Sequence, residues 1–342
     1  MSTTTQPRTL PILDLSRFRA GDAEREAFLA DVRHAAHDVG FFMVTGHGVP
    51  AAVTDEVMAQ GRAFFRLPLE AKLAIENVNS PQFRGYTRVG TEVTAGAADQ
   101  REQLDVGPER EPLELGPDDP AYLRMVGPNL WPDAAQPALR PAVLGFLDEA
   151  ERVMREILRV LAAALGQPED HFDRWFDDQS WLNLKVVRYP GRDATESDQG
   201  VGSHKDYGYL ALLLQDDLGG LQVEAADGSW IDATPVPGAF VVNIGEMLEI
   251  ATQGYLRATK HRVVSPPAGR DRMSVPAFLG PRLDAVVTPL ELPADLAAQA
   301  RGVEAESHNV IVPHFGENTV RGWLRSHPRV AQRWWADVAP PA

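Results

Sequence analysis

Residues 209–244 read YLALLLQDDLGGLQVEAADGSWIDATPVPGAFVVNI, in which short apolar runs alternate with turn-forming residues. The same texture extends over residues 180–284. We expect short strands at residues 181–189, 209–215, 221–224, 239–244, 261–264 and 273–279. Many short strands at close spacing indicate a sandwich or barrel, here of the jelly-roll type.

The rest of the chain is expected to surround this β core. Residues 22–39 and a segment after Pro50 carry apolar side chains at helical spacing, and residues 137–165 form the longest predicted helix, which Gly166 ends. Residues 77–135 are irregular and rich in Gly, Pro and Asp, and a stretch of that length usually lines or covers a site. The predicted fold class is therefore α+β, with a mainly β jelly-roll core flanked by helices.

Composition and charge narrow the range of functions. The 342 residues include 33 Lys and Arg against 48 Asp and Glu, for a formal net charge of −15, so we expect neither nucleic acid nor anionic membrane as a partner. The absence of Cys excludes disulfides, thiolate metal sites and cysteine nucleophiles, and it fits a reducing compartment. Residues 1–9 lack the apolar run of a signal peptide. We expect a cytoplasmic protein.

Two His-x-Asp pairs, His171/Asp173 and His204/Asp206, are candidate metal ligands. In an extended segment, residues two apart point to the same face and can bind one ion, whereas on a helix they diverge. Aromatic residues lie at helical spacing around the first pair, so we interpret that pair as a helix surface. The second pair follows a turn-rich stretch and precedes a predicted strand, which is where jelly rolls carry metal ligands.

A His-x-Asp pair alone is more often two solvated loop residues than a metal site. Three further residues favour a metal-ligand role for His204 and Asp206. His261 opens another predicted strand, and two imidazoles with one carboxylate form the facial ligand set of non-haem iron(II) oxygenases. Arg272 and Ser274 share one face of the next strand, where a planar guanidinium beside a hydroxyl suits a bound carboxylate. A surface charge is the alternative interpretation of Arg272.

With these residues in place, the chain resembles the isopenicillin N synthase-like family of iron(II)- and 2-oxoglutarate-dependent dioxygenases. The resemblance covers residues 10–328. Besides the His204, Asp206, His261, Arg272 and Ser274 pattern, the matching stretches are Leu10-Pro-Ile-Leu-Asp-Leu15, Gly40-Phe-Phe-Met-Val-Thr-Gly-His-Gly48, Val187-Arg-Tyr-Pro190, Asp217-Leu-Gly-Gly-Leu-Gln-Val223 and Pro237-Gly-Ala-Phe-Val-Val-Asn-Ile-Gly-Glu246. Arg84-Gly-Tyr86 and residues 102–109 resemble bacterial members in particular.

The resemblance implies a distorted double-stranded β-helix and a division of the chain into four segments. These are a non-haem dioxygenase N-terminal domain (10–125), a helical connection (137–177), the iron(II)/2-oxoglutarate jelly-roll core (180–284) and a C-terminal tail that packs on the core (285–342).

The resemblance also implies a cofactor set of Fe(II), 2-oxoglutarate as co-substrate and O2. By it, Arg272 and Ser274 bind the distal carboxylate of 2-oxoglutarate, whose keto acid end chelates the metal. Tyr189 matches a tyrosine that points at the co-substrate or substrate in many members, with packing in the core as the alternative. Val187 stands where plant members often carry Asn, so a contact from that position is lost.

The implied reaction is oxidation of an unactivated C–H of a small molecule, with release of succinate and CO2. Hydroxylation is the default outcome, and desaturation or cyclisation also occur in the family. Arg84, Tyr86 and Phe278 are candidate substrate-binding residues, with packing or surface charge as the alternative for each. The substrate is expected to belong to secondary metabolism, while its identity, the oligomeric state and the loop that closes over the site are left open.

Three rival functions stay open at the level of sequence. The first is an oxidase of the same family that does not use 2-oxoglutarate, since some such members keep the Arg-x-Ser pattern. The second is a non-catalytic jelly-roll binding protein, whose signature would be a lost ligand. The third, a zinc hydrolase with the same three ligands, gives no role to Arg272 and Ser274.

We predict no measurable DNA or RNA binding near physiological salt. A chain with a net charge of −15 and no basic run has few cations with which to release counterions from a phosphate backbone. A gel-shift titration measures this, and a salt-dependent shift at submicromolar protein would contradict the prediction.

Overall fold

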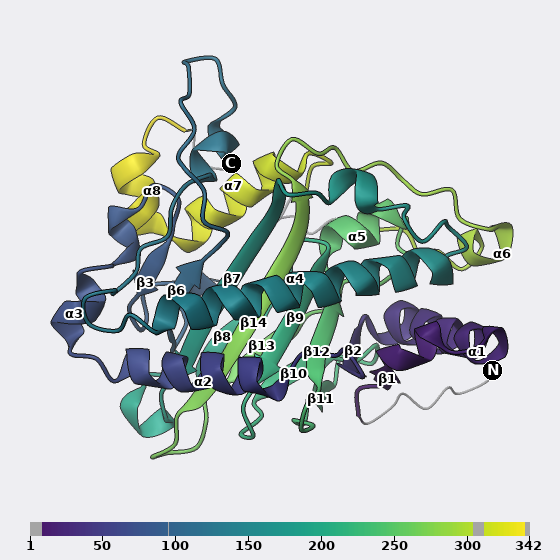
Figure 1. Ribbon diagram of the computed structural model, residues 1–342, viewed down its shortest axis with the longest axis horizontal. Coiled ribbons are helices and arrows are strands. Elements are labelled where there is room, and N and C mark those ends of the chain that lie inside the picture. The colour runs from purple at the N-terminus through teal and green to yellow at the C-terminus, as the bar shows by residue number, and fades with distance from the viewer. Residues whose placement is uncertain (1–8, 95, 304–310, 339–342) are drawn as a thin grey trace.

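The computed structural model describes residues 9–94, 96–303 and 311–338. Two β-sheets form its centre, with helices around them (Figure 1). The larger sheet contains, in spatial order, β1 (Ile12–Asp14), β2 (Phe41–Thr45), β12 (Phe240–Ile244), β9 (Leu210–Gln215), β14 (Arg272–Arg282), β7 (Ser180–Tyr189), β6 (Glu102–Val106) and β3 (Gly85–Thr87). The smaller sheet contains β11 (Trp230–Asp232), β10 (Leu221–Glu224), β13 (His261–Val264) and β8 (Gln199–His204). This pair of sheets confirms the predicted jelly-roll core.

The two sheets pack face to face through alternating side chains. Phe41 and Met43 of β2 share one apolar cluster with Val223 of β10 and Val263 of β13, which lie on the opposing sheet. Phe42, which lies between Phe41 and Met43 in the chain, packs in a second apolar cluster, between the large sheet and the helices. The period of two along a strand therefore gives the large sheet two buried faces.

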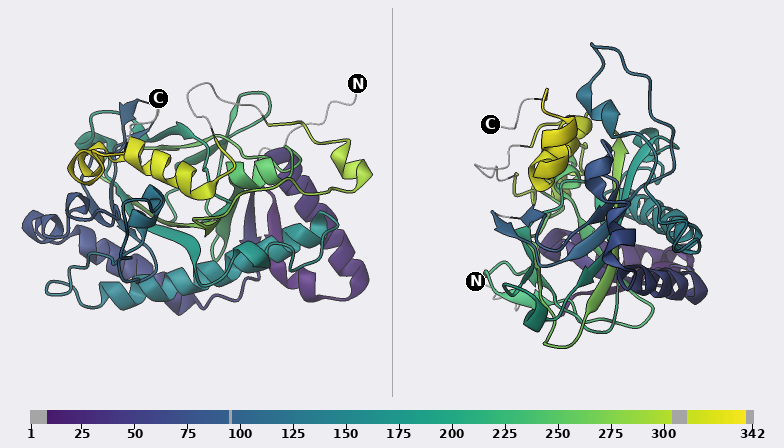
Figure 2. Two further views of the ribbon diagram at one scale, coloured as in Figure 1. Left: turned by 90° about the horizontal axis from the view of Figure 1, so that it is seen from above. Right: turned by 90° about the vertical axis from the view of Figure 1, so that its left-hand side faces the viewer.

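Helices cover the large sheet on both sides. Their bounds are α1 (Asp22–His34), α2 (Ala51–Phe65), α3 (Leu69–Leu73), α4 (Leu139–Ala164), α5 (Glu246–Ala251), α6 (Ala294–Ala297), α7 (Phe315–Ser326) and α8 (Pro328–Trp334). Short 3-10 helices span Leu15–Arg19, Asn77–Asn79, Ala121–Met125, Asp173–Trp175 and Arg192–Ala194, and a π-helical turn spans Ala35–Val39. Figure 2 shows α4 and α7 on opposite sides of the sheet, and both helices contact β14. None of the helices within the described residues is long and apolar enough to cross a membrane.

The long helix α4 forms because its apolar residues recur at helical spacing. Val143, Phe146, Ala150, Val153 and Ile157 are all buried, and this stripe packs on β9 and β14 as the sequence predicts. The helix ends before Gly166, whose φ of +71° is accessible to glycine at little cost.

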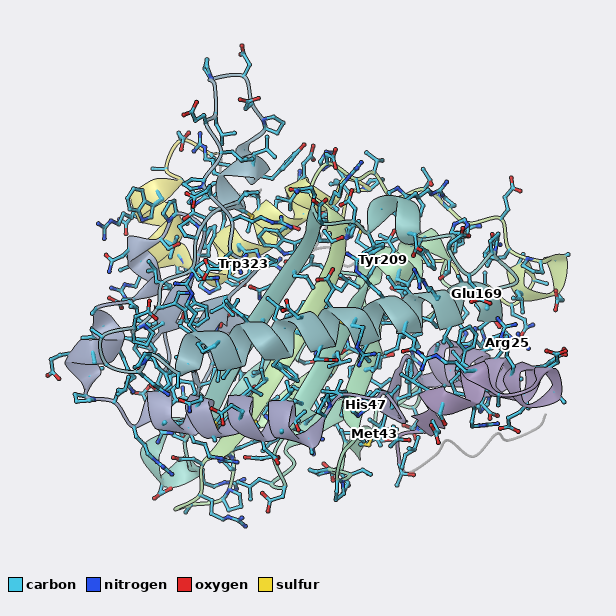
Figure 3. All side chains as sticks on the ribbon, viewed as in Figure 1. Arg25, Met43, His47, Glu169, Tyr209 and Trp323 are labelled. Carbon is cyan, nitrogen blue, oxygen red and sulfur yellow. The ribbon has the colours of Figure 1, made fainter. Side chains whose placement is uncertain are left out.

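Ion pairs and aromatic contacts tie the N-terminal region to the rest. Arg25 on α1 pairs with Glu169 beyond the end of α4, and the two side chains lie together in Figure 3. His47 follows β2; its ring lies 4.3 Å from that of Phe240, and its Nε2 is 2.9 Å from the carbonyl oxygen of Gly238. These contacts give His47 a packing role.

Three local differences separate the observed elements from the predicted ones. The sequence analysis does not predict β8, because QGVGSH has little apolar pattern and is extended only through its pairing with β13. The segment 77–135 is less irregular than expected, since it supplies β3, β6 and the hairpin of β4 (Val93–Thr94) and β5 (Ala97–Ala98). His171 and Asp173 lie in a turn and a 3-10 helix, not in the α-helix predicted for them.

We predict that Phe146→Ala lowers the free energy of unfolding by about 3–5 kcal/mol, the usual cost of removing a buried phenyl ring. Phe146 is fully buried and its ring lies 6.0 Å from that of Phe240. Urea unfolding measures the change, and Asp148→Ala on the exposed side of α4 is the control. Equal stability of the two variants would mean that α4 is not a main support of the sheet.

Candidate metal centre and co-substrate pocket

Three candidate ligands meet at one end of the small sheet. His204 is the last residue of β8, His261 is the first residue of β13, and the two are paired partners in the antiparallel ladder. Asp206 follows two residues after His204. Its Oδ1 lies 3.6 Å from His204 Nε2, and its Oδ2 lies 3.8 Å from His261 Nε2. One ligand atom from each residue lies within 4.8 Å of the others, close enough for all three to bind one ion.

Neighbouring groups orient these side chains. The Nδ1 of His204 is 2.8 Å from the carbonyl oxygen of Gly202, and the Nδ1 of His261 is 3.2 Å from that of Thr259. An Nδ1–H that donates to a carbonyl leaves Nε2 with a free lone pair, which is the arrangement found at metal-bound histidines. Asn243 on β12 donates from Nδ2 to Asp206 Oδ2 at 2.8 Å, which holds the carboxylate in place.

The protonation states also suit a metal. Burial lowers the pKa of His261 to about 4, and the nearby His204 acts in the same direction, so the His261 ring is neutral. Burial acts to raise the pKa of Asp206, but His261 and His204 outweigh it and hold that pKa below its usual value. Two imidazoles and an ionised carboxylate on one face fit Fe(II), whose remaining positions stay open in such sites.

A buried, unpaired cation lies on the facing sheet. Arg272, the first residue of β14, is 0% exposed. Its Nη1 donates to Ser274 Oγ at 3.4 Å and its Nη2 donates to Gln215 Oε1 at 3.2 Å, while its Nε has no hydrogen-bond partner. Its guanidinium carbon lies 4.9 Å from the centre of the Tyr189 ring.

Among the residues that the structure describes, no carboxylate lies within ion-pair distance of the Arg272 guanidinium. A buried charge without a counterion is strongly unfavourable. The orphaned Nε and the hydroxyl of Ser274 therefore fit the carboxylate of a small anion, as expected for 2-oxoglutarate.

A cavity of about 620 Å³ opens beside the candidate ligands. His204 and Asp206 line one part of it, and the other walls come from β7, β14, α7 and the β4–β5 hairpin. Part of the segment 77–135 thus lines the cavity, as expected from the length of that segment. Phe278 on β14 is one of the wall residues.

The other two candidate substrate residues lie outside the cavity wall. Arg84 is behind it, where Nη1 donates to Asn183 Oδ1 at 2.6 Å and the guanidinium carbon lies 5.1 Å from the centre of the Trp181 ring. Tyr86 donates its hydroxyl to Glu102 Oε2 at 2.6 Å. Neither Arg84 nor Tyr86 therefore lines the cavity, and either could influence a bound molecule only through neighbouring residues.

Outside the ligand segment 203–208, the wall holds five charged or ionisable residues that are not among the site residues predicted from the sequence, namely Glu92, Arg101, Lys185, Arg325 and His327. One signal was available, because Lys185 shares the inward face of β7 with Trp181, and a cation at such a position is unusual. Nothing local marks the others, which reach the cavity from distant segments.

The comparisons with known proteins agree with this geometry. Residues 10–134 match the family described as non-haem dioxygenase in morphine synthesis, N-terminal, and residues 181–281 match the 2OG-Fe(II) oxygenase superfamily. The chain is 39% identical to the 2-oxoglutarate-dependent dioxygenase frbJ of Dothideomycetidae sp. (strain 11243), over 95% of this chain and 92% of the relative. It is 35% identical to a homoarginine-6-hydroxylase of Arabidopsis thaliana, over 84% and 89% respectively.

Solved structures of similar proteins also match this chain over most of its length. A full-length Neurospora crassa protein, crystallised in complex with alpha-KG, matches with a TM-score of 0.72 and 27% identity, over 92% of this chain and 95% of that one. A 2OG-Fe(II) oxygenase family protein of Caulobacter crescentus matches with a TM-score of 0.73 and 28% identity, over 92% and 98%. The sequence relatives named above are fungal and plant proteins, so they do not support the expected bacterial grouping.

We predict that purified protein binds about one Fe(II) per chain, and that His204→Ala, Asp206→Ala or His261→Ala each abolishes turnover, because each removes one of three metal ligands. Metal analysis and succinate release measure the two effects. The control is the double variant His171→Ala/Asp173→Ala, which lies outside the cluster and should keep both iron and turnover. Loss of iron in that control, with retention in His204→Ala, would show that the wrong pair had been chosen.

Proposed function

Because this chain belongs to the 2OG-Fe(II) oxygenase superfamily, we propose that His204, Asp206 and His261 hold its iron and that Arg272 and Ser274 hold the distal carboxylate of 2-oxoglutarate. The protein is an Fe(II)- and 2-oxoglutarate-dependent oxygenase that acts on small molecules. The residue roles and the type of oxidation are the proposed part.

Arg272 is the observation that carries the co-substrate assignment. It is a fully buried cation with an unpartnered Nε, and it lies on β14 with Ser274 two residues away on the same face. A dicarboxylate that binds the metal at one end needs a cationic partner for its other carboxylate, and a guanidinium beside a hydroxyl suits that role. A zinc hydrolase would leave this buried charge without a partner.

The bound iron, with 2-oxoglutarate and O2, supplies the oxidant that removes a hydrogen atom from an unactivated C–H, while 2-oxoglutarate becomes succinate and CO2. The chain's own residues orient and protect this reaction. The backbone carbonyls at Gly202 and Thr259 fix the two imidazoles, and Asn243 fixes the carboxylate of Asp206. The cavity offers room for a small substrate beside His204 and Asp206.

We propose hydroxylation as the reaction outcome, with desaturation or cyclisation as variants of the same chemistry. The relatives called homoarginine-6-hydroxylases support hydroxylation of a small polar substrate, and a role in secondary metabolism suits a substrate of that kind. The second candidate function is an oxidase of the family that works without 2-oxoglutarate. The buried Arg272, whose Nε has no hydrogen-bond partner, favours the 2-oxoglutarate-dependent oxygenase over this oxidase.

Several finer assignments remain part of the proposal. Tyr189 packs against the Arg272 guanidinium, so it borders the co-substrate carboxylate. The proposed organisation of the chain consists of an N-terminal domain (10–125), a helical connection (137–177), the jelly-roll core (180–284) and a C-terminal tail (285–342). A cytoplasmic placement is supported by the absence of Cys, and the absence of nucleic-acid and membrane partners by the net charge of −15.

We predict that Arg272→Leu weakens 2-oxoglutarate binding by roughly ten- to a hundredfold or more, since a charge-assisted hydrogen bond contributes about 1.5–3 kcal/mol and each 1.4 kcal/mol is about tenfold. Iron affinity should barely change, because Arg272 is not a ligand. Arg272→Lys should fall between, since it keeps the charge and loses the planar fork.

The measurement is a titration of 2-oxoglutarate into the anaerobic Fe(II) protein, followed by the absorption of the metal–keto acid chelate. Arg270→Leu is the matched control, because Arg270 is exposed and lies two residues away. If Arg272→Leu titrates like the wild type, the co-substrate pocket lies elsewhere and the oxidase function takes over.

A further inference from the structure

The cavity beside the metal ligands is bordered by buried side chains of both charges. We name Glu92, Asp99, Arg101, Asp105 and Lys185 the charged cluster. Arg101 Nη2 lies 3.0 Å from Glu92 Oε2 and 3.2 Å from Asp99 Oδ2. Lys185 Nζ lies 3.3 Å from Glu92 Oε1 and 3.0 Å from Asp105 Oδ1. Positive and negative groups thus alternate, and Glu92, Arg101 and Lys185 line the cavity itself.

Several polar atoms at this wall have no hydrogen-bond partner. Glu92 Oε2 is paired electrostatically with Arg101 but accepts no hydrogen bond, and Arg101 Nε donates none. Both ring nitrogens of His327 are likewise unpartnered, although this residue is only 4% exposed and its Nε2 is 4.0 Å from Glu92 Oε1. Buried polar groups are nearly always satisfied, so this group of atoms calls for a ligand.

The protonation states give these atoms defined roles. Burial acts to raise the pKa of Glu92, but Arg101 and Lys185 outweigh it and hold that pKa below its usual value, so Glu92 is a carboxylate. Burial lowers the pKa of His327, so its ring is neutral and offers one donor and one acceptor. The wall therefore presents a carboxylate oxygen that accepts no hydrogen bond, a guanidinium whose Nε donates none, and a neutral imidazole.

The rest of the wall is mixed, because large apolar and aromatic side chains lie there together with Asn183, Lys205 and Arg325. Trp181, Phe278, Phe315 and Trp323 line the cavity, and Trp323 lies on α7 (Figure 3). Its ring stacks on His327 with 4.9 Å between the centroids, and its Nε1 donates to the Tyr207 hydroxyl at 3.1 Å. The cavity thus has large aromatic side chains, the charged residues Glu92, Arg101 and Lys185, and two of the candidate metal ligands in one wall.

We propose that the charged cluster binds the ammonium and carboxylate groups of a free α-amino acid, with Glu92 receiving the ammonium and Arg101 the carboxylate. His327 completes the site as a neutral hydrogen-bonding partner, and the side chain of the amino acid lies along the aromatic walls toward His204 and Asp206. This inference rests on the proposed function, because it takes that side chain to carry the oxidised C–H.

The alternation of charges selects this class of ligand over others. An anion near Arg101 would also face the Glu92 carboxylate, and a cation near Glu92 would face Arg101 and Lys185. A neutral apolar molecule would leave the unpartnered atoms buried and unsatisfied, at a cost for each. A zwitterion satisfies both signs and adds no net charge to the wall.

The test uses the intact protein loaded with Fe(II) and 2-oxoglutarate without oxygen. The genetically encoded L-amino acids and L-homoarginine are titrated in, and calorimetry and the absorption of the chelate report binding. We expect at least one amino acid to bind, and its N-acetyl and methyl ester derivatives to bind at least about tenfold more weakly, a difference of about 1.4 kcal/mol. The proposal is overturned if none of them binds, or if the blocked derivatives bind as tightly.

A variant separates recognition from a purely structural effect. Glu92→Gln should weaken binding of the free amino acid and leave binding of its N-acetyl derivative unchanged, whereas a structural effect would weaken both alike and overturn the role of Glu92. Glu114→Gln, in an exposed loop, is the matched control. If Glu92→Gln does not fold, the ligand comparison on the unaltered protein decides.

The two proposals fail in different ways. 2-Oxoglutarate is titrated into the same samples before any amino acid is added. Normal co-substrate binding with no amino acid binding overturns the substrate class alone, whereas loss of co-substrate binding overturns the proposed function.

Discussion

The pairing of β8 with β13 is the constraint on which the site depends. It sets His204 opposite His261 at one end of the small sheet, and Asp206 then follows at the point where β8 ends. Because side chains alternate between the faces of a strand, a slip of one residue would turn one imidazole away from the other. The backbone register of two neighbouring strands therefore assembles the ligand set before any metal binds.

Packing of the two sheets adds the second element of the site. The apolar cluster between them holds the large sheet, which includes β14, against the small one. Arg272 is thereby carried into the interior, and no carboxylate of the described residues pairs with it. Such a charge destabilises the empty protein and is offset only when an anion binds. Binding of an anion at Arg272 would therefore recover this cost.

The third element, the substrate cavity, comes from parts of the chain that the jelly roll does not include. Glu92 and Arg101 flank the β4–β5 hairpin, Lys185 lies on β7, and His327 follows α7. The charged groups pair with one another, but Glu92 Oε2, Arg101 Nε and both ring nitrogens of His327 have no hydrogen-bond partner. The core therefore carries the candidate metal ligands, and the added hairpin and C-terminal helix supply much of the cavity wall beside them.

The sequence by itself determined the jelly-roll core and the long helix α4, because hydrophobic periodicity is a local property. It also singled out His204, Asp206 and His261 as candidate ligands, through the His-x-Asp pair together with the wider family pattern. It did not determine β8, which has little apolar pattern and is extended only by pairing with β13. Nor could it place Arg84 behind the cavity wall or His327 within it, since both positions depend on how segments far apart in the chain pack together. Tertiary structure decided these points because burial and charge pairing are properties of the assembled fold.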